Sequence, residues 1–384
     1  MRTHPCGMAV IGLLCLAFAA RTQPAGVPPY VAPGAEGPVA VLLDEEIEPL
    51  FPLLNNAGGG ESGTVAREER DVFAGIESVR VTPLQKYQPN IPGWSFKIVE
   101  TPKEKGEFRH VRFAWKKFGG SGVMVQLHDS DKQGWGLRYH AGGNAPGWQS
   151  KLVSEKSPAE WQIVTRDLFK DFGVVTITGL ALTAMDGESA LFDHVLLGRS
   201  VADLDRETDV ALGRSKAASA LLGKAREAAW ADLQGADRKK AAAALRTFLA
   251  TASEHIGFIS EKLPRPDPAI QSRIRKLITD FDAHAFATRQ KATEDLIAIG
   301  APALPAVREA AHSSDPEVQY RAEKVLKSLA DSGAGSGTAS RIVRILERAE
   351  TPAAKDLLKR LVAGDFGAEY SADAKLALTR LRVQ

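Results

Sequence analysis

The chain has 384 residues, of which 44% are hydrophobic and 25% charged, so it can bury a sizeable core and is neither disordered nor fibrous. At about 150 residues per domain, this length predicts two domains or one large one. Lysine and arginine total 49 against 47 aspartate and glutamate, a net charge of +2. That balance argues against the basic face that nucleic-acid binding needs, and we expect no nucleic-acid partner.

Residues 1–19 have the pattern of a secretory signal peptide. Arg2 precedes an apolar run at 8–20, which is too short to span a bilayer, and residues 17–19 (AFA) supply an A-x-A cleavage site. The alternative is a buried N-terminal helix. Cys6 and Cys15 both lie in this segment, so a mature chain would hold no disulfide or zinc–thiolate site. We expect a secreted or periplasmic protein with no membrane span.

The next segments predict a linker followed by a β domain. Residues 20–37 are rich in proline, glycine and alanine, which is typical of a flexible linker. From 38 to 202, short alternating runs are separated by glycine-rich turns, which predicts an all-β, jelly-roll-like sandwich. The expected strands include 77–81, 111–115, 123–127, 161–165, 174–182 and 190–197.

After residue 202 the period of the apolar residues changes from strand-like to helical. Residues 203–217 are polar, and we expect them to form an inter-domain linker. The remainder, 218–384, is predicted to be an all-α solenoid of helix pairs. Two apolar sets superpose at a constant offset of 30 residues: Ala292, Leu296 and Ile299, then Ala322, Leu326 and Leu329.

The helical half resembles the HEAT-repeat family. The residues that carry the resemblance are 304–307 (LPAV), 315–318 (DPEV) and the apolar positions that follow them. Gln319 departs from the family pattern, which usually has arginine there, whereas Arg289 occupies the matching position one repeat earlier. The resemblance implies helix pairs that present a surface to a protein partner.

The β half resembles a galactose-binding-like jelly roll, the type found in many secreted carbohydrate-binding modules. The residues are 75–81, which are similar to an early strand, and 190–196, which are similar to the last strand. Together the halves resemble secreted bacterial proteins that join such a module to HEAT repeats. The resemblance implies glycan binding and a structural calcium, with Asp71 and Asp193 as alternative ligands.

Three tryptophans in the β half are candidates for contact with a sugar. Each lies beside glycine or proline in an expected turn, where side chains reach solvent. The alternative is packing beneath long loops, because tryptophan is mostly buried. The candidate ligand-binding residues are Trp94, Trp135, Trp148, Arg138, His140 and Asn144.

Residues 129–134 (DSDKQG) resemble the start of a calcium loop. Asp129 and Asp131 would supply alternate oxygens to the ion. Gln133 stands where a third acid is expected, and His140 stands in place of the closing glutamate. The alternative is an ordinary hairpin turn. We expect no other cofactor.

No catalytic motif was found, so the sequence favours a non-enzymatic binding or scaffold protein. Its β-sandwich would dock on a glycan or another extracytoplasmic polymer, and its helical repeats would bind a protein. Two alternatives stay open. One is a glycoside-active enzyme, because two distant carboxylates leave no local signature. The other is a purely structural protein–protein interaction module.

A helix expected at about 218–233 predicts how the helical half begins. Apolar residues recur along it at helical spacing, with Trp230 beside them. The first helix of a solenoid has no preceding repeat to cover it. We therefore expect it to cap the solenoid, with Trp230 packed on the helix that starts at Arg238. The alternative is that Trp230 docks on the sandwich.

Overall fold

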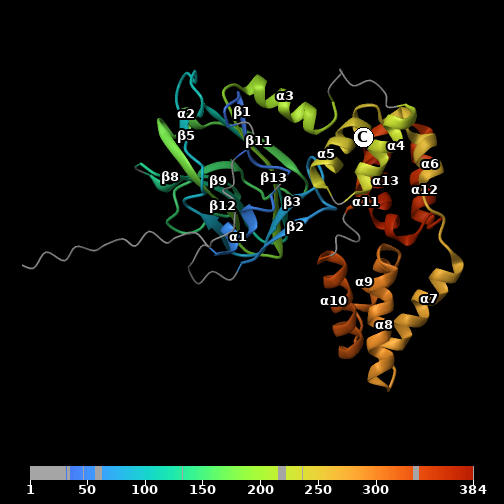
Figure 1. The fold of residues 1–384 in the computed structure, drawn as a ribbon. Coiled ribbons are helices and arrows are strands. Elements are labelled where there is room, and N and C mark those ends of the chain that lie inside the picture. Colours follow the sequence, from blue (N-terminus) through green and yellow to red (C-terminus); the bar gives the residue numbers. More distant parts are fainter. Residues whose placement is uncertain are drawn as a thin grey trace, which may run out of the picture.

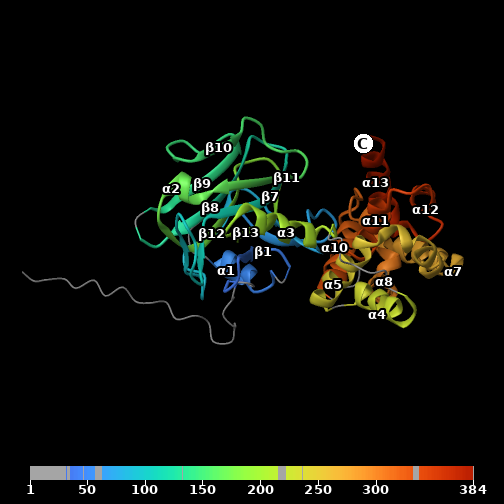
Figure 2. The same cartoon turned by 90° about the horizontal axis from the view of Figure 1, so that it is seen from above.

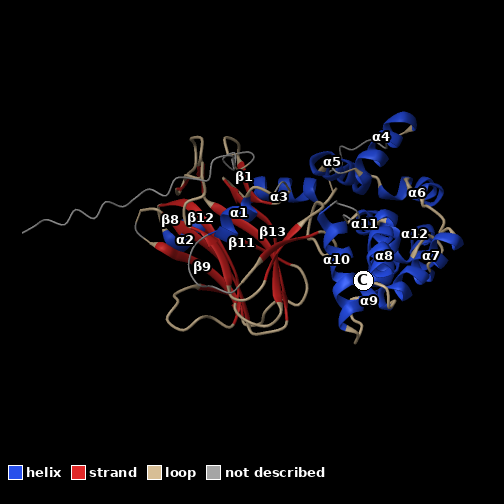
Figure 3. Cartoon of the chain, turned by 60° about the horizontal axis from the view of Figure 1, so that its bottom comes forward, coloured by secondary structure: helices blue, strands red, loops and turns tan. Residues whose placement is uncertain are grey.

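The computed structural model describes residues 35–45, 47–56, 63–131, 133–214, 222–235, 237–331 and 337–383, together with Ala32. Strands fill the N-terminal half and helices fill the C-terminal half (Figure 1 and Figure 3). The predicted β-sandwich joined to a helical domain is thus confirmed. The proposed signal peptide and most of the proposed 20–37 linker lie outside the described residues. No described helix is both long and apolar enough to cross a membrane.

The N-terminal half forms two sheets, which we call sheet A and sheet B. Its strands are β1 (Val39–Leu43), β2 (Val65–Glu68), β3 (Ser78–Val81), β4 (Gln85–Gln88), β5 (Phe96–Ile98), β6 (Glu107–Phe108), β7 (His110–Phe118), β8 (Gly122–Asp129), β9 (Gly134–Gly142), β10 (Lys151–Ser154), β11 (Gln162–Asp167), β12 (Val175–Ala184) and β13 (Ser189–Gly198). In the described chain, sheet A has the order β11-β7-β13-β3-β2, with β1 also paired to β13. Sheet B has the order β10-β9-β8-β12-β5-β6, with β4 paired to β12.

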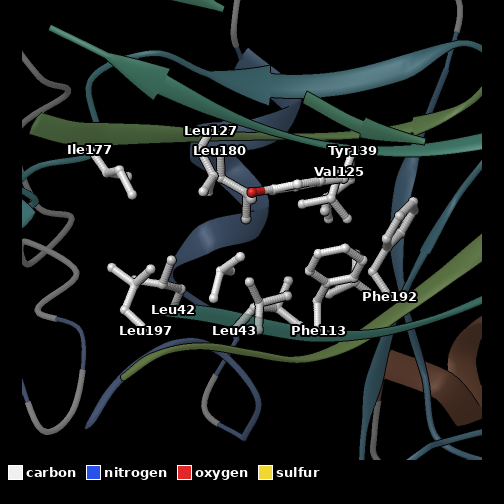
Figure 4. Packing of buried hydrophobic residues seen from close by; sticks show 14 of the residues in the cluster. Leu42, Leu43, Phe113, Val125, Leu127, Tyr139, Ile177, Leu180, Phe192 and Leu197 are labelled. Carbon is white, nitrogen blue, oxygen red and sulfur yellow. The ribbon is translucent and has the colours of Figure 1, made fainter. Parts of the chain in front are cut away.

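Each run named above forms a strand; β13 is buried along its whole length, whereas in β11 Val164 is buried and Ile163 is exposed. The core lies between the sheets, where Val125 and Leu127 of β8 face Phe113 of β7 and Phe192 of β13 (Figure 4). Trp115 is fully buried in the same cluster, as its place inside a strand predicts.

Strand β9 differs from the expectation, which placed Trp135 in a turn. Its glycines resemble turn signals, but the segment pairs with β8 along most of its length. Gly142, at the end of β9, has a φ of 71°. A Cβ there would lie 2.1 Å from the carbonyl oxygen of Ser121, so only glycine fits beside β8. These glycines permit close approach within a sheet, a use that local sequence does not distinguish from a turn.

Three helices accompany the sandwich: α1 (Leu50–Asn56), α2 (Leu168–Phe172) and α3 (Val201–Ala211). Helix α3 occupies much of the segment expected as a polar linker. The Ser200 side chain caps it by accepting from the N–H of Asp203, and Leu204 packs against Leu196 of sheet A. Arg112 of β7 also donates to Thr208 of α3 at 2.8 Å. A single buried stripe is enough to fix an otherwise polar helix on the sheet.

The C-terminal half contains helices in the order expected for helix pairs. They are α4 (Gly223–Gln234), α5 (Arg238–Ala250), α6 (Ile256–Lys262), α7 (Pro268–Thr279), α8 (Phe286–Ile299), α9 (Leu304–Ala310), α10 (Pro316–Asp331), α11 (Thr338–Ala349), α12 (Pro352–Ala363) and α13 (Ser371–Val383). Ala292 and Leu296 of α8 share a core with Ala322 and Leu329 of α10. The 30-residue offset therefore relates two helices that pack together.

The helical half is not a strictly linear solenoid. Helices α7–α10 have their own core, and α4–α6 share a second core with α11–α13 (Figure 1). Helix α11 packs on α5, about a hundred residues earlier in the chain. In a linear solenoid each repeat contacts only its neighbours. Stripes at helical spacing indicate which faces are buried, but not against which partner.

The contacts between α8 and α10 show what replaces the arginine that the HEAT pattern has at the position of Gln319. Arg321, two residues later, is 2% exposed and donates to Glu317 at 2.8 Å and to Thr293 at 3.3 Å. Arg289 of α8 donates to the same Glu317 oxygen at 2.8 Å. One carboxylate and two guanidinium groups thus join α8 to α10 without an arginine at 319.

Trp230 packs as predicted, on the helix that starts at Arg238. Its ring lies edge-on to Phe248 of α5, with centroids 6.2 Å apart, and to Phe258 of α6 at 5.6 Å. The indole is 7% exposed. Trp230 is therefore part of the helical core.

The sandwich and the helical half meet along a contact that we call the seam, formed by residues 69–77 of the sandwich and by helices α5, α11 and α13. Glu77 has no exposed side-chain surface and pairs with Arg238 of α5 at 2.7 Å. Arg70 pairs with Asp373 of α13 at 2.6 Å. Both ion pairs join residues that are far apart in sequence.

Apolar and buried charged groups complete the seam. Ile76 is fully buried in the core of the helical half, although it belongs to the sandwich. The Arg344 guanidinium of α11 donates to the Gly75 carbonyl oxygen. Burial raises the pKa of Glu45 and Asp193 well above their ordinary values. Burial also lowers the pKa of Arg344, and the charges of Asp193 and Glu45 oppose that effect. The two halves therefore share a built interface (Figure 2).

Candidate functional site

The candidate site is the outer face of sheet B, on the side of the sandwich away from α4–α13 (Figure 1 and Figure 2). Successive side chains of a strand point to opposite faces. Because Val123, Val125 and Leu127 of β8 enter the core, the residues between them point outward. The outward side chains of β4, β8, β9 and β12 that form the candidate site are Gln85, Tyr87, Met124, Gln126, His128, Trp135, Arg138, His140 and Thr183.

Strand register aligns three of these positions, together with Ala181, in a row across the sheet. Gln126 of β8 lies opposite Arg138 of β9 on one side and opposite Ala181 of β12 on the other. Ala181 in turn lies opposite Tyr87 of β4. The small alanine separates the polar end of the row from its aromatic end.

A hydrogen-bond network forms the floor of this face. Gln126 is 2% exposed and donates through Nε2 to Gln85 Oε1 at 2.8 Å and to Thr183 Oγ1 at 2.9 Å. Its Oε1 accepts from Nε of Arg138 at 2.7 Å. Because the network uses donors and acceptors from four strands, it fixes the direction of every side chain in it.

Aromatic rings border the floor at two places. Trp135 packs edge-on to His128, with centroids 5.0 Å apart, and to Tyr87 at 5.6 Å. Trp148, on the loop after β9, lies under the guanidinium of Arg138, 4.6 Å from its ring centroid. Both indoles are half-buried, so each keeps accessible surface.

Trp94 does not belong to this face, and its prediction as a ligand contact is wrong. It is 4% exposed and packs edge-on to Phe96 of β5, with centroids 5.5 Å apart. Its turn folds back beneath the sheet, and Ile91 of the same turn is buried with it. Trp94 therefore packs in the core beneath a loop, which was the alternative interpretation of these tryptophans.

His140 and Asn144 serve the loop after β9. His140 is 8% exposed, and its Nδ1 lies 2.9 Å from Oγ of Ser150. The Asn144 amide donates to that same hydroxyl at 2.9 Å and to the carbonyl oxygen of Trp148 at 2.7 Å. Both residues therefore support the loop that carries Trp148, and their contact with a sugar stays a prediction.

Asp129 and Asp131 occupy a hairpin turn. Asp129 is 2% exposed, and its carboxylate accepts the N–H groups of Asp131, Gln133 and Thr176. These bonds use the oxygens that an ion would need. Asp131 accepts from Ser130 at 3.2 Å. The two residues therefore support the hairpin turn, and calcium binding there stays a prediction.

The alternative calcium ligands are also engaged elsewhere. Asp71 accepts from the indole N–H of Trp161 at 2.7 Å, and Asp193 accepts from the N–H groups of Phe73 and Ala74. Within the described ranges, no three His, Cys, Asp or Glu side chains are placed to hold a metal ion. A structural calcium stays a prediction of the resemblance alone.

The imidazoles of the candidate face predict a pH effect on stability. Burial lowers the pKa of His128 below its ordinary value of 6.5. The folded state then binds fewer protons than the unfolded state below pH 6.5, so the contribution of His128 to stability is lost as the pH falls. We expect the unfolding free energy of the wild type to fall relative to that of His128→Gln between pH 7.5 and 5.5, measured by urea denaturation. Parallel curves for the two proteins would contradict this.

Six of the nine side chains named for the candidate face were not anticipated as site residues from sequence. Arg138, Trp135 and Trp148 were predicted from their types and turn-like neighbours. Gln85 and Tyr87 were missed, because β4 is a short strand without clear alternation. Gln126 was expected only as a strand residue, and its outward direction was the available signal.

Comparison with known proteins gives likenesses of the sandwich alone. No protein-family model matches the chain, and no curated protein matches it. A family 29 carbohydrate-binding module matches at 12% identity, over 42% of this chain and 92% of the module, with a TM-score of 0.24. The family 30 module of a Clostridium thermocellum cellulosomal cellulase matches at 15% identity, over 35% and 81%, with a TM-score of 0.23.

An enzyme is also among the structures that match. An arabinose-bound α-L-arabinofuranosidase matches at 9% identity, over 40% of this chain and 26% of the enzyme, with a TM-score of 0.23. All of these TM-scores are below 0.5. The function of the β half must therefore be argued from its own residues.

Proposed function

We propose that this chain is a non-enzymatic binding protein that docks on a glycan through the outer face of sheet B. The observation that carries the proposal is the pair of half-buried indoles, Trp135 and Trp148, on either side of a fixed polar floor. The electron-rich face of an indole attracts the C–H groups of a sugar ring, and amide and guanidinium groups bind its hydroxyls. Rings and polar groups here share one face of one sheet.

The residues of this face favour binding over hydrolysis. Glycoside hydrolysis needs two carboxyl groups flanking the bond that breaks. None of the outward side chains named for the candidate site is an aspartate or a glutamate, and Glu107 of β6, on the same face of sheet B, is paired with Lys97. A glycoside-active enzyme is therefore the second candidate, and activity screening on polysaccharides tests it: turnover abolished by a single carboxylate substitution would overturn the binding proposal.

The proposal also includes a secreted or periplasmic location and a HEAT-like role for part of the helical half. Secretion or a periplasmic location is supported by the pattern of residues 1–19. A HEAT-like role for α7–α10 is supported by the 30-residue offset and by the packing of α8 on α10. A protein partner for these helices stays a prediction, as does a purely structural role for the whole chain.

Changing the two indoles tests glycan binding. We expect Trp135→Ala and Trp148→Ala each to weaken binding by about tenfold or more, because buried aromatic anchors dominate the energetics of contact surfaces. Binding is measured by affinity electrophoresis and calorimetry on a panel of soluble polysaccharides. Tyr320→Ala is the matched control, since it removes an aromatic ring that is 59% exposed on α10. Unchanged binding in both tryptophan variants would contradict the proposal.

A further inference from the structure

Around Trp135 and Trp148, one residue sets the charge of the candidate face, because Lys97 of β5 and Glu107 of β6, further along sheet B, pair with each other at 4.0 Å. Arg138 is the only arginine, lysine, aspartate or glutamate among the outward side chains named for this face. In the part of the chain that the structure describes, no carboxylate forms an ion pair with it. Burial alone lowers the pKa of its guanidinium, and no neighbouring carboxylate opposes this effect. The face therefore presents a partly desolvated cation without a counter-charge.

The surroundings of Arg138 hold its guanidinium in one orientation. Nε donates to Gln126 at 2.7 Å, and Gln126 is itself fixed by Gln85 and Thr183. The guanidinium carbon lies over the Trp148 ring, 4.6 Å from its centroid. The two terminal nitrogens make no hydrogen bond to any described residue, so their fork is left for a ligand.

A fixed guanidinium fork has a preferred partner. Two parallel N–H groups match the two oxygens of a carboxylate or of a sulfate ester, and such charge-assisted bonds are about twice as strong as neutral ones. Leaving a cation partly buried and unpaired costs free energy that an anionic ligand would recover. Neutral sugar hydroxyls recover less of it.

We infer that the glycan bound by this face is anionic, carrying a carboxylate or a sulfate that pairs with Arg138 while neighbouring sugar rings contact Trp135 and Trp148. This inference rests on the proposed function and adds the chemical class of its ligand. The shared chemistry is a planar or tetrahedral oxyanion on a sugar ring. Uronic acids and sulfated sugars are its two sources.

The experiment compares matched polymers on one protein. Calorimetry and affinity electrophoresis of the full chain use polyuronate, the same polyuronate with its carboxyl groups reduced to alcohols, a sulfated polysaccharide, and a neutral glucan. We expect a preference of about tenfold or more for one of the anionic polymers over its neutral counterpart. The uronate and sulfate arms distinguish the two sources. Reduction of the carboxyl groups needs no variant, so this arm does not depend on folding.

Variants identify the residue responsible. Arg138→Met keeps the aliphatic stem but removes the charge, and we expect it to bring the anionic polymer down to the affinity of the neutral one. Arg138→Lys should restore only part of the preference, because a lysine lacks the fork. Arg206→Met on α3, where the side chain is 71% exposed, is the control for net charge and should change binding less than twofold. Each variant is checked by circular dichroism.

The outcomes separate the inference from the proposed function. If neutral and anionic polymers bind equally well, and Arg138→Met leaves both affinities unchanged, the inference is wrong while glycan binding stands. If Arg206→Met weakens the anionic polymer as much as Arg138→Met does, the preference is a general charge effect and the inference is also wrong. If no polymer of any class binds, the proposed function itself fails.

Discussion

Replacing Glu77 by alanine should lower the free energy of unfolding by about 3–5 kcal/mol, the range found when one partner of a buried ion pair is removed. The Glu77 side chain has no exposed surface and lies 2.7 Å from both Arg67 and Arg238. Its second oxygen accepts from the N–H of Ile47 at 3.3 Å. Without this carboxylate, two guanidinium groups would lose the buried charge that they share, and among the described residues Arg67 would keep only Glu48 and Arg238 only Glu69 as partners. Urea denaturation, followed by circular dichroism, measures the effect.

Two further substitutions make this prediction specific. Glu77→Gln keeps the side-chain volume and the acceptor for the N–H of Ile47 but removes the charge. We therefore expect it to cause most of the loss in unfolding free energy that Glu77→Ala causes. Glu48→Ala removes a carboxylate that pairs with the same Arg67 but is 69% exposed, and it should cost no more than about 1 kcal/mol. If Glu77→Ala costs no more than Glu48→Ala, the seam does not depend on this buried pair.

Replacing Trp230 by alanine should destabilise the helical half by about 3–5 kcal/mol, the usual cost of removing a large buried aromatic. The ring is 7% exposed and contacts Phe248 and Phe258, which come from two other helices. Its loss would leave a cavity between α4, α5 and α6. Thermal and urea unfolding of the full chain measure the change, and Trp230→Phe should recover part of it.

The matched control lies at the start of the same helix. Leu222, directly before α4, is 71% exposed, and Leu222→Ala should change stability by no more than about 0.5 kcal/mol. A Trp230→Ala protein as stable as Leu222→Ala would show that α4 is not anchored through this ring.

The parts of the fold that could be predicted from sequence are those held by contacts between residues close together in the chain. The apolar runs at 111–115 and 123–127 indicated strands from local sequence alone, and the structure buries every residue of both runs. The 30-residue offset between α8 and α10 likewise indicates two helices, close together in the chain, that bury equivalent apolar positions. Trp230 was placed correctly because its partner helix follows at once in the chain.

The site was predictable in its residue types and less so in their arrangement. Trp94 and Trp135 have similar neighbours in sequence. Trp94 follows a proline and a glycine, and Trp135 has a glycine on each side. One is buried under β5, and the other lies on the outer face of sheet B. Which face a turn folds against depends on strands from elsewhere in the chain, so the tertiary structure decides between them.

By itself, then, the sequence determined that a β half precedes a helical half, where most long elements lie, and that Arg138, Trp135 and Trp148 are candidates for ligand contact. The tertiary structure alone decided that β4 brings Gln85 and Tyr87 to the same face, and that α11 returns to α5. It also decided that residues 69–77 dock on α5 and α13. These contacts join residues from about 40 to 300 positions apart, as in Gln85 with Gln126 and Arg70 with Asp373. These contacts depend on the shape and charge of surfaces that exist only once the chain has folded. A local stretch of sequence does not specify which distant segment it will contact.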